Sequence, residues 1–304
     1  MNIATPPVGA LNYQSCRYGQ SKTLFRGPQR SLSGDYAVCI GGTETFGKFI
    51  PAPFPDLLEA EIDLPMINLG CQRAGVDTYM SSQSLLDICS DAKFTIIQIM
   101  GAANMSNRFY TVDPRNNERF LRAARRLKEI YPEIDFTKFE LTNQMLTELA
   151  EVGADRLHLV RHELQCAWVA RMRSLLSQIA GPKILLWLAG HAPFSNKQGG
   201  TICREPLFVD RGMLNAIRDD ADALIEVVAN PVEVKVGRSE MLIDPMESIS
   251  ANEILGPVVH RRVVEALRPA IARLLEPGKA DEGADTAMPP PTETLDFRQP
   301  LALS

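Results

Sequence analysis

Five short apolar runs, bounded by turn-forming residues, constrain the fold of this chain more than any other feature. Several are almost continuous in apolar residues, which is typical of strands buried on both faces of a parallel sheet. Helical patterns separate the runs, and this alternation indicates an open, doubly wound α/β sheet. The sequence therefore predicts a three-layer α/β/α sandwich with a five-stranded parallel sheet, whose ligands bind beyond the carboxyl ends of the strands. The predicted strands are Tyr36–Ile40, Met66–Leu69, Phe94–Met100, Ile184–Leu188 and Ala223–Val228.

The segments between these runs predict the helical layers. Amphipathic patterns predict helices over about residues 55–61, 82–91, 211–219 and 255–275. The stretch from about residue 108 to 181 is too long for one crossover helix, and Pro132 and Gly153 interrupt it. We interpret this stretch as a helical insertion that forms a cap or a dimer surface.

The two ends of the chain differ from the middle in composition. Residues 1–34 are irregular and locally basic, which indicates either a strap across the domain surface or an anion-binding arm. Residues 277–304 are rich in proline and acidic residues, a composition that favours a disordered tail. The α/β domain is therefore expected over residues 35–276.

Composition excludes several classes of protein. The 304 residues include 32 basic and 37 acidic side chains, a net charge of −5, which argues against a broad basic surface for nucleic acid. The longest apolar run, around Ile184–Ala189, is too short to span a membrane, and the amino terminus has no basic or apolar signal segment. None of the six cysteines forms a Cys-x-x-Cys pair, so a zinc knuckle has no support. We expect a cytoplasmic protein with reduced thiols.

The turn after the first predicted strand allows two interpretations. Gly42-x4-Gly47-Lys48 is close to a phosphate-binding P-loop, but Phe49 stands where that motif needs Ser or Thr for magnesium. Prolines follow where the P-loop would open into a helix. The alternative is that Thr43 exposes a hydroxyl nucleophile at the carboxyl edge of the sheet.

The block from Gly41 to Gly47 resembles the opening motif of the SGNH (GDSL) hydrolases, Gly-Asp-Ser-x-Thr-x-Gly. Thr43 stands at the position of that family's serine nucleophile, and Gly42 replaces the aspartate. The resemblance implies a flavodoxin-like sheet and an ester hydrolase or acyltransferase activity.

Two later segments are similar to the family's second and third blocks, in the same order along the chain. Gly75 follows the second strand, and Asn104 follows the third. The resemblance implies that the amides of Thr43 and Gly75 and the Asn104 side chain form an oxyanion hole, which stabilises developing negative charge.

The whole chain also resembles a family of uncharacterised alphaproteobacterial proteins, a domain of unknown function. The motifs that carry this resemblance are Tyr18-Gly19, Phe25-Arg26-Gly27-Pro28, Gly41–Gly47 and Ser106–Tyr110. It implies no activity.

The final hydrolase motif, Asp-x-x-His before the last helix, is incomplete. Asp244 is present, but no histidine follows it before the last predicted helix, where the segment contains Ser250 and Ala251 instead. Two other histidines are candidate bases. His260 lies one turn into the last predicted helix, and His191 follows the fourth strand, although either could simply be a structural histidine.

Other polar residues are candidates for substrate contacts. Arg108 and Tyr110 follow the third-strand loop and could bind an anionic group near Asn104. Glu44 is a further substrate-contact candidate, and with Asp244 it could form an acid/base couple if the fold brings them together. His158 and His162 are spaced as one helix face requires, but zinc needs a third ligand, so we expect no metal and no cofactor.

Two functions follow from this sequence. The first is hydrolysis or transfer of an acyl ester on a small molecule or glycan, with Thr43 as nucleophile. The second is a catalytically degenerate protein that binds such a ligand or acts as a scaffold, which the three departures from the motifs favour. The sequence gives no reason to expect nucleic acid or membrane as a partner, and it leaves the oligomeric state open.

Overall fold

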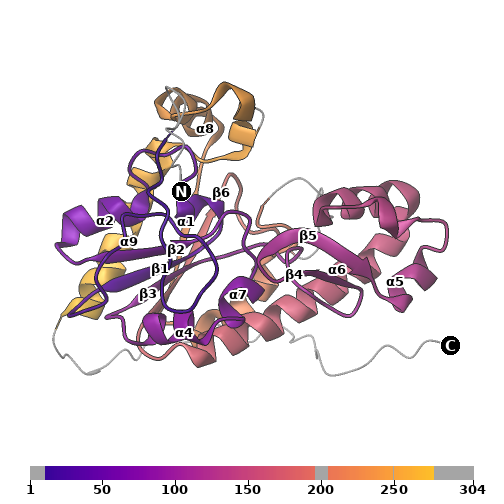
Figure 1. The fold of residues 1–304 in the computed structure, drawn as a ribbon, viewed down its shortest axis with the longest axis horizontal. Coiled ribbons are helices and arrows are strands. Elements are labelled where there is room, and N and C mark those ends of the chain that lie inside the picture. Colours follow the sequence, from indigo (N-terminus) through magenta and orange to yellow (C-terminus); the bar gives the residue numbers. More distant parts are fainter. Residues whose placement is uncertain (1–10, 196–204, 249, 277–304) are drawn as a thin grey trace.

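The computed structural model describes residues 11–195, 205–248 and 250–276, and its centre is one parallel sheet (Figure 1). The strands are β1 (Ala37–Gly41), β2 (Met66–Gly70), β3 (Thr95–Gln98), β6 (Lys183–Ala189) and β7 (Ala223–Val228). They lie in the order β2-β1-β3-β6-β7, and every neighbouring pair is parallel. The predicted three-layer sandwich with a five-stranded, flavodoxin-like sheet is therefore confirmed.

The apolar runs are continuous because the central strands are buried on both faces. All five residues of β1 are buried. Val38 and Ile40 belong to a core that includes Trp168, whereas Ala37 and Cys39 belong to a second core on the opposite face. A strand in this position has no solvent-facing side, so the alternation of polar and apolar residues disappears.

Helices cover both faces of the sheet (Figure 1). The first core packs against α4 (Gln83–Ser90), α6 (Thr142–Gln178) and α7 (Arg211–Ile217). The second core packs against α2 (Phe54–Ile62) and α9 (Pro257–Leu275). The remaining elements are α1 (Thr43–Phe46), α3 (Asp77–Met80), α5 (Arg125–Ile130), α8 (Pro231–Gly237) and the short 3-10 turns η1 (Phe136–Lys138), η2 (Arg218–Asp220), η3 (Arg238–Glu240), η4 (Pro245–Glu247) and η5 (Ser250–Glu253).

The expected helical insertion begins with a hairpin instead of a helix. Strands β4 (Tyr110–Asp113) and β5 (Asn116–Ala123) pair antiparallel. Asn117 is buried in β5, where its side-chain oxygen accepts hydrogen bonds from the Gly75 amide and the Thr78 hydroxyl. This polar residue is buried through tertiary hydrogen bonds, so the hydrophobic pattern could not reveal the strand. The expected interruption at Gly153 is present as non-helical backbone within α6.

The described part of the amino-terminal arm packs against the domain. Its Arg26 guanidinium is 6% exposed and donates hydrogen bonds of 2.7, 2.9 and 2.7 Å to the carbonyl oxygens of Gly47, Ile50 and Pro51. Arg30 forms an ion pair with Glu59 of α2. These contacts make residues 11–34 a strap that fixes the segment after α1. The first ten residues of the arm and the predicted tail at 277–304 lie outside the described residues.

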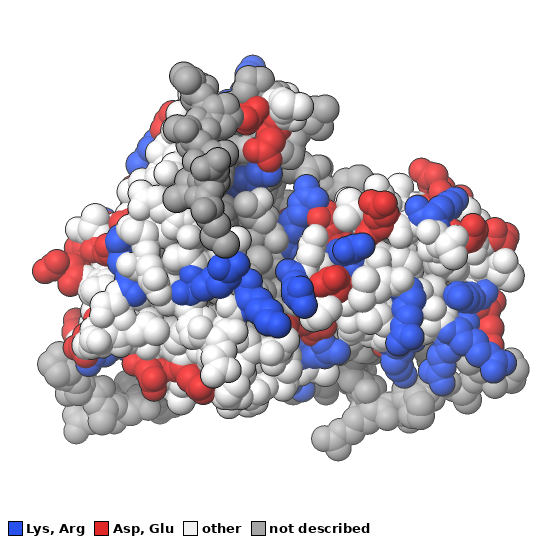
Figure 2. All heavy atoms as spheres, in the orientation of Figure 1, with Lys and Arg blue, Asp and Glu red and all other residues white. Residues whose placement is uncertain are grey.

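The surface carries charges of both signs. Figure 2 shows basic and acidic side chains interspersed on the face drawn, with basic ones gathered over the end that holds β5 and α5. Within the described ranges, no helix has the length and apolarity needed to cross a lipid bilayer.

The close approach of two backbones at Gly75 predicts a large cost for an added methyl group. A Cβ on Gly75 would lie 1.6 Å from the Asn104 carbonyl oxygen. We expect Gly75→Ala to lower the free energy of unfolding by about 2 kcal/mol or more in urea titrations, because overpacking forces the backbone apart. Gly190→Ala is the matched control, since no described heavy atom lies within 4 Å of its added Cβ. Equal stability of the two variants would contradict the close approach.

Candidate functional site

The sheet has its topological switch point between β1 and β3, where the chain leaves β1 toward β2 and later returns to the other side. Ligands of doubly wound sheets bind beyond the carboxyl ends of the strands at such a point. The turn of Gly41 and Gly42 and the short helix α1 lie there. Gln98, the last residue of β3, holds this turn in place. Its Oε1 accepts hydrogen bonds from the Gly42 amide (3.1 Å), the Thr45 amide (3.0 Å) and the Thr45 hydroxyl (2.5 Å).

Position 41 has space only for glycine. Its φ of 159° is at the limit of the range that other residues avoid, and a Cβ there would lie 2.3 Å from the Thr45 hydroxyl oxygen and 2.5 Å from Gln98 Cβ. The Tyr79 hydroxyl lies against both the amide and the carbonyl oxygen of Gly41. The turn that presents Thr43 is therefore rigid.

Thr43 is half-buried at the start of α1. Its Oγ1 accepts a hydrogen bond of 3.0 Å from the Arg73 amide. Its own amide and its hydroxyl hydrogen have no partner among the described residues. All four histidines of the chain are described, and no hydrogen bond joins any of them to Thr43.

Glu44, which follows Thr43 in the chain and has a side chain that is 13% exposed, forms an acid–imidazole pair with His260. His260 is fully buried in α9, and its Nε2 is 4.0 Å from Glu44 Oε2. Its Nδ1 accepts a hydrogen bond of 3.0 Å from the Phe54 amide, so the neutral ring carries its proton on Nε2. Nε2 has no hydrogen-bond partner within the described chain.

Burial keeps both members of this pair uncharged. It raises the pKa of Glu44 from 4.5 to about 8, against the opposing effect of the Leu255 amide, which donates to the carboxyl group. Burial also lowers the pKa of His260 from 6.5 to about 3, and the positive charge of Arg26 adds to this shift. His260 is therefore neutral at pH 7, and its only lone pair faces Phe54 and not Thr43.

His191, the other candidate base, lies at the end of β6 against backbone carbonyls. Its Nδ1 is 2.9 Å from the Ala192 oxygen, and its Nε2 is 3.1 Å from the Glu205 oxygen. The ring stacks on Phe194 at a centroid separation of 4.5 Å. These contacts are those of a histidine that stabilises its own loop.

The three predicted oxyanion donors gather around the backbone of Arg73. Thr43 accepts from the Arg73 amide, and Asn104 Nδ2 donates to the Arg73 carbonyl at 3.3 Å. Gly75 packs on Asn104, and its amide donates to Asn117 Oδ1 at 3.1 Å. The fold thus brings Thr43, Gly75 and Asn104 together, but only the Thr43 amide is unpartnered.

Three further candidates, Asp244, Arg108 and Tyr110, make contacts within other parts of the fold. The Asp244 carboxylate accepts a 2.9 Å hydrogen bond from the Met246 amide at the start of η4. The Arg108 guanidinium is ion-paired with Glu163 of α6. Tyr110 is buried and donates to the Ala103 carbonyl at 2.6 Å. Neither Asp244 nor Arg108 has a described hydrogen bond or ion pair with Thr43, Glu44 or a histidine.

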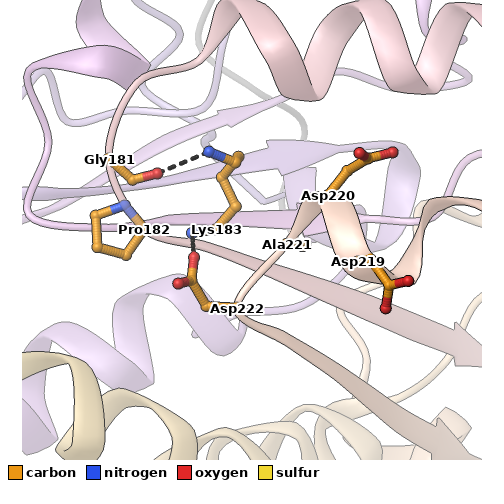
Figure 3. Close-up of a pocket in the computed structure, with 7 residues that line it drawn as sticks. All are labelled: Gly181, Pro182, Lys183, Asp219, Asp220, Ala221 and Asp222. Carbon is orange, nitrogen blue, oxygen red and sulfur yellow. Dashed lines mark hydrogen bonds between the residues drawn. The ribbon is translucent and has the colours of Figure 1, made fainter. Parts of the chain in front are cut away.

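A large surface cavity lies at the opposite ends of the strands (Figure 3). It measures about 470 Å³ and is lined by residues 181–183 and 219–222, where β6 and β7 begin. The Lys183 ammonium donates to the carbonyl oxygens of Ile179 and Gly181, so it is satisfied within the chain. Among the described residues, no group of three or more side chains is arranged to hold a metal ion.

Gln98 and Arg73 are the site residues that the sequence patterns missed. The only signal for Gln98 is an amide side chain near the carboxyl end of a mostly apolar strand, and that signal does not show which groups the side chain meets. Arg73 contributes backbone atoms, for which the sequence carries no signal.

The raised pKa of Glu44 predicts a stability that depends on pH. The folded protein keeps the Glu44 proton up to about pH 8, whereas the unfolded chain loses it near pH 4.5. Between these values the free energy of unfolding should fall with rising pH, by at most about 5 kcal/mol. Glu44→Gln removes this fall, so the variant gains stability over the natural protein from pH 5 to pH 8 in urea titrations.

The lowered pKa of His260 acts in the opposite direction in both proteins, because its stabilising contribution is lost as the pH falls from 6.5 toward 3. The difference in the free energy of unfolding between the natural protein and Glu44→Gln therefore reports the contribution of Glu44 alone. Glu61→Gln is the control, since salt-bridged Glu61 is exposed and the Arg268 hydrogen bond lowers its pKa. Parallel pH profiles for the natural protein and Glu44→Gln would contradict the burial of this carboxyl group.

Comparison with curated proteins finds no match to this sequence. Among solved structures, the chain is similar to a carbohydrate esterase family 2 enzyme with a carbohydrate-binding domain from Corynascus thermopiles (Myceliophthora fergusii). The identity is 10% and the TM-score 0.41, over 82% of this chain and 69% of that one. It is also similar to a catalytic mutant of an acetylxylan esterase from Geobacillus stearothermophilus, at 12% identity and a TM-score of 0.38, over 78% of this chain and 94% of that one.

A protein from Lactobacillus plantarum is similar at 11% identity and a TM-score of 0.37, over 79% of this chain and 97% of that one. TM-scores in this range carry no argument about activity. The match to a family model is much broader, because it extends over residues 1–275. The chain belongs to the family described as Domain of unknown function (DUF6473).

Proposed function

We propose that this protein binds a small molecule or glycan carrying an acyl ester at the turn between β1 and α1, without hydrolysing it. One observation carries the proposal: Thr43 has no hydrogen bond to any histidine, and the His260 lone pair is occupied by the Phe54 amide. A threonine hydroxyl is a poor nucleophile unless a base lies within hydrogen-bond reach. A site without that base keeps the capacity to bind and loses the chemistry.

The contacts of Thr43 also support binding. Its amide and hydroxyl hydrogen are without partners in the described chain, so both can donate to an oxygen of a ligand. The residue lies at the switch point of the sheet, where doubly wound folds bind their ligands. The rigid turn fixes these donors before the ligand arrives, which reduces the entropy lost on binding.

Hydrolysis or acyl transfer is the second candidate, favoured by the half-buried Thr43 hydroxyl and by the grouping of Gly75 and Asn104 beside it. In that function Thr43 would be the nucleophile, with His191 or His260 as base and Asp244 as orienting carboxylate. Glu44, Arg108 and Tyr110 would contact the substrate. This function requires the Phe54–His260 hydrogen bond, or the contacts of His191, to open first.

Ester turnover separates the two candidates. We expect the natural protein to hydrolyse p-nitrophenyl acetate and an acetylated xylo-oligosaccharide no faster than Thr43→Ala does, because no base activates the hydroxyl. Backbone amide NMR spectra should nevertheless show ethyl acetate binding at Gly42 and Thr43.

Rapid ester turnover by the natural protein would favour the hydrolase. Turnover at least about a hundredfold above that of Thr43→Ala would establish the hydrolase and sink the binding proposal, since general-base catalysis contributes about that much or more. Thr43→Ser serves as the matched variant. It keeps the hydroxyl and removes only the methyl group, so in a hydrolase it would retain activity.

A further inference from the structure

Gln98 has donor groups that the fold does not use. Its side-chain oxygen is fully occupied by the three donors from Gly42 and Thr45. Its side-chain nitrogen, Nε2, makes no hydrogen bond within the described residues. The residue is 6% exposed, and Nε2 is not among the fully buried unpaired side-chain atoms, so this NH₂ group reaches solvent and has no acceptor among the described residues.

The orientation of this side-chain amide is determined by its neighbours. The two backbone amides that lie at 3.1 and 3.0 Å can only donate, so the atom that they meet must be the oxygen. The nitrogen consequently points away from these donors. A flipped amide would set its own hydrogens against two N–H groups, which excludes that alternative.

The Nε2 group borders a space left by Gly42. A Cβ built on Gly42 would have Gln98 Nε2, at 4.0 Å, as its nearest described neighbour. In the motif that this turn resembles, an aspartate side chain occupies this position, whereas here there is none. The oxygen of this side-chain amide is held by the turn while its nitrogen is open to solvent beside Gly42, so the N–H groups are positioned to donate to an oxygen atom of a ligand.

The charges nearby favour a neutral oxygen. Lys48, at the end of the turn, is ion-paired with Glu247, and Arg73 is ion-paired with Glu118. The donors that face the space are thus uncharged amide groups, whereas a carboxylate would bring a full charge into a nearly buried site.

We infer that the Gln98 side-chain amide binds the carbonyl oxygen of the acyl ester, which lies beside Gly42. This inference rests on the proposed function and names the group that recognises its ligand. Gln98 would then have two functions in one side chain: its oxygen holds the turn, and its nitrogen binds the ligand.

Gln98→Glu tests the two functions separately. The carboxylate still accepts the hydrogen bonds from Gly42 and Thr45, but it replaces the N–H donors with an oxygen that repels a carbonyl. We expect the affinity for ethyl acetate, titrated by the backbone amide signals of Gly42 and Thr43, to fall about tenfold or more. The urea midpoint should also fall, because the carboxylate brings a charge into a nearly buried position, so binding is compared under urea-free conditions where both proteins are folded.

A measurement on the natural protein needs no variant. The Gln98 side-chain NH₂ signal should shift on addition of ethyl acetate, and sodium acetate at the same concentration should shift it less. The control is the Gln165 side-chain signal, whose nitrogen already donates to the Phe208 carbonyl at 3.0 Å and to Asp210 Oδ2 at 3.1 Å. It should not move.

The outcomes distinguish this inference from the function on which it rests. If ethyl acetate shifts the amides of Gly42 and Thr43 but leaves the Gln98 NH₂ signal unchanged, Gln98 is not the donor and the binding function stands. A response to acetate and not to the ester would overturn the choice of a neutral carbonyl. If no signal at the turn responds to the ester, the proposed function fails and this inference fails with it.

Discussion

The hydrogen bonds accepted by the Gln98 oxygen are the interaction on which the site depends. They join the turn after β1 to the end of β3, across the point where the sheet reverses its winding. Without them, the buried amides of Gly42 and Thr45 would lack an acceptor, at a cost of roughly 1–3 kcal/mol each. The conformation of Thr43 is thus fixed by a residue more than fifty positions away in the chain.

Two further contacts hold the same turn from other directions. Arg26 reaches from the amino-terminal strap to three carbonyl oxygens of residues 47–51, a segment with little regular structure of its own. Glu44 and His260 join α1 to α9 as an uncharged pair. Both groups are neutral at pH 7 because the desolvation free energy of the charged form exceeds the stabilisation that neighbouring groups provide. The turn is consequently a rigid platform and not a mobile loop.

The chemistry available at this platform depends on one lone pair. Neutral imidazole has a single basic nitrogen, and in His260 that nitrogen accepts the Phe54 amide. A histidine in the right region of the fold therefore supplies no base for Thr43, which shows in physical terms why a fold does not by itself imply an activity. Thr43 and Gln98 keep donors that have no partner among the described residues, and donors alone are sufficient for recognition of an acyl group.

The sequence by itself determined the sheet, because strands buried on both faces leave continuous apolar runs, and it placed Thr43 at the carboxyl edge. It did not reveal the hairpin at 110–123, since Asn117 is buried through hydrogen bonds with Gly75 and Thr78 and not through an apolar pattern. The sequence indicated His260 as a candidate base, but it could not show that its basic nitrogen accepts a hydrogen bond from Phe54. It also gave no indication that Gln98, a polar residue within a strand, holds the turn. Protonation state and hydrogen-bond direction depend on which groups meet in space, so only the tertiary structure decided them.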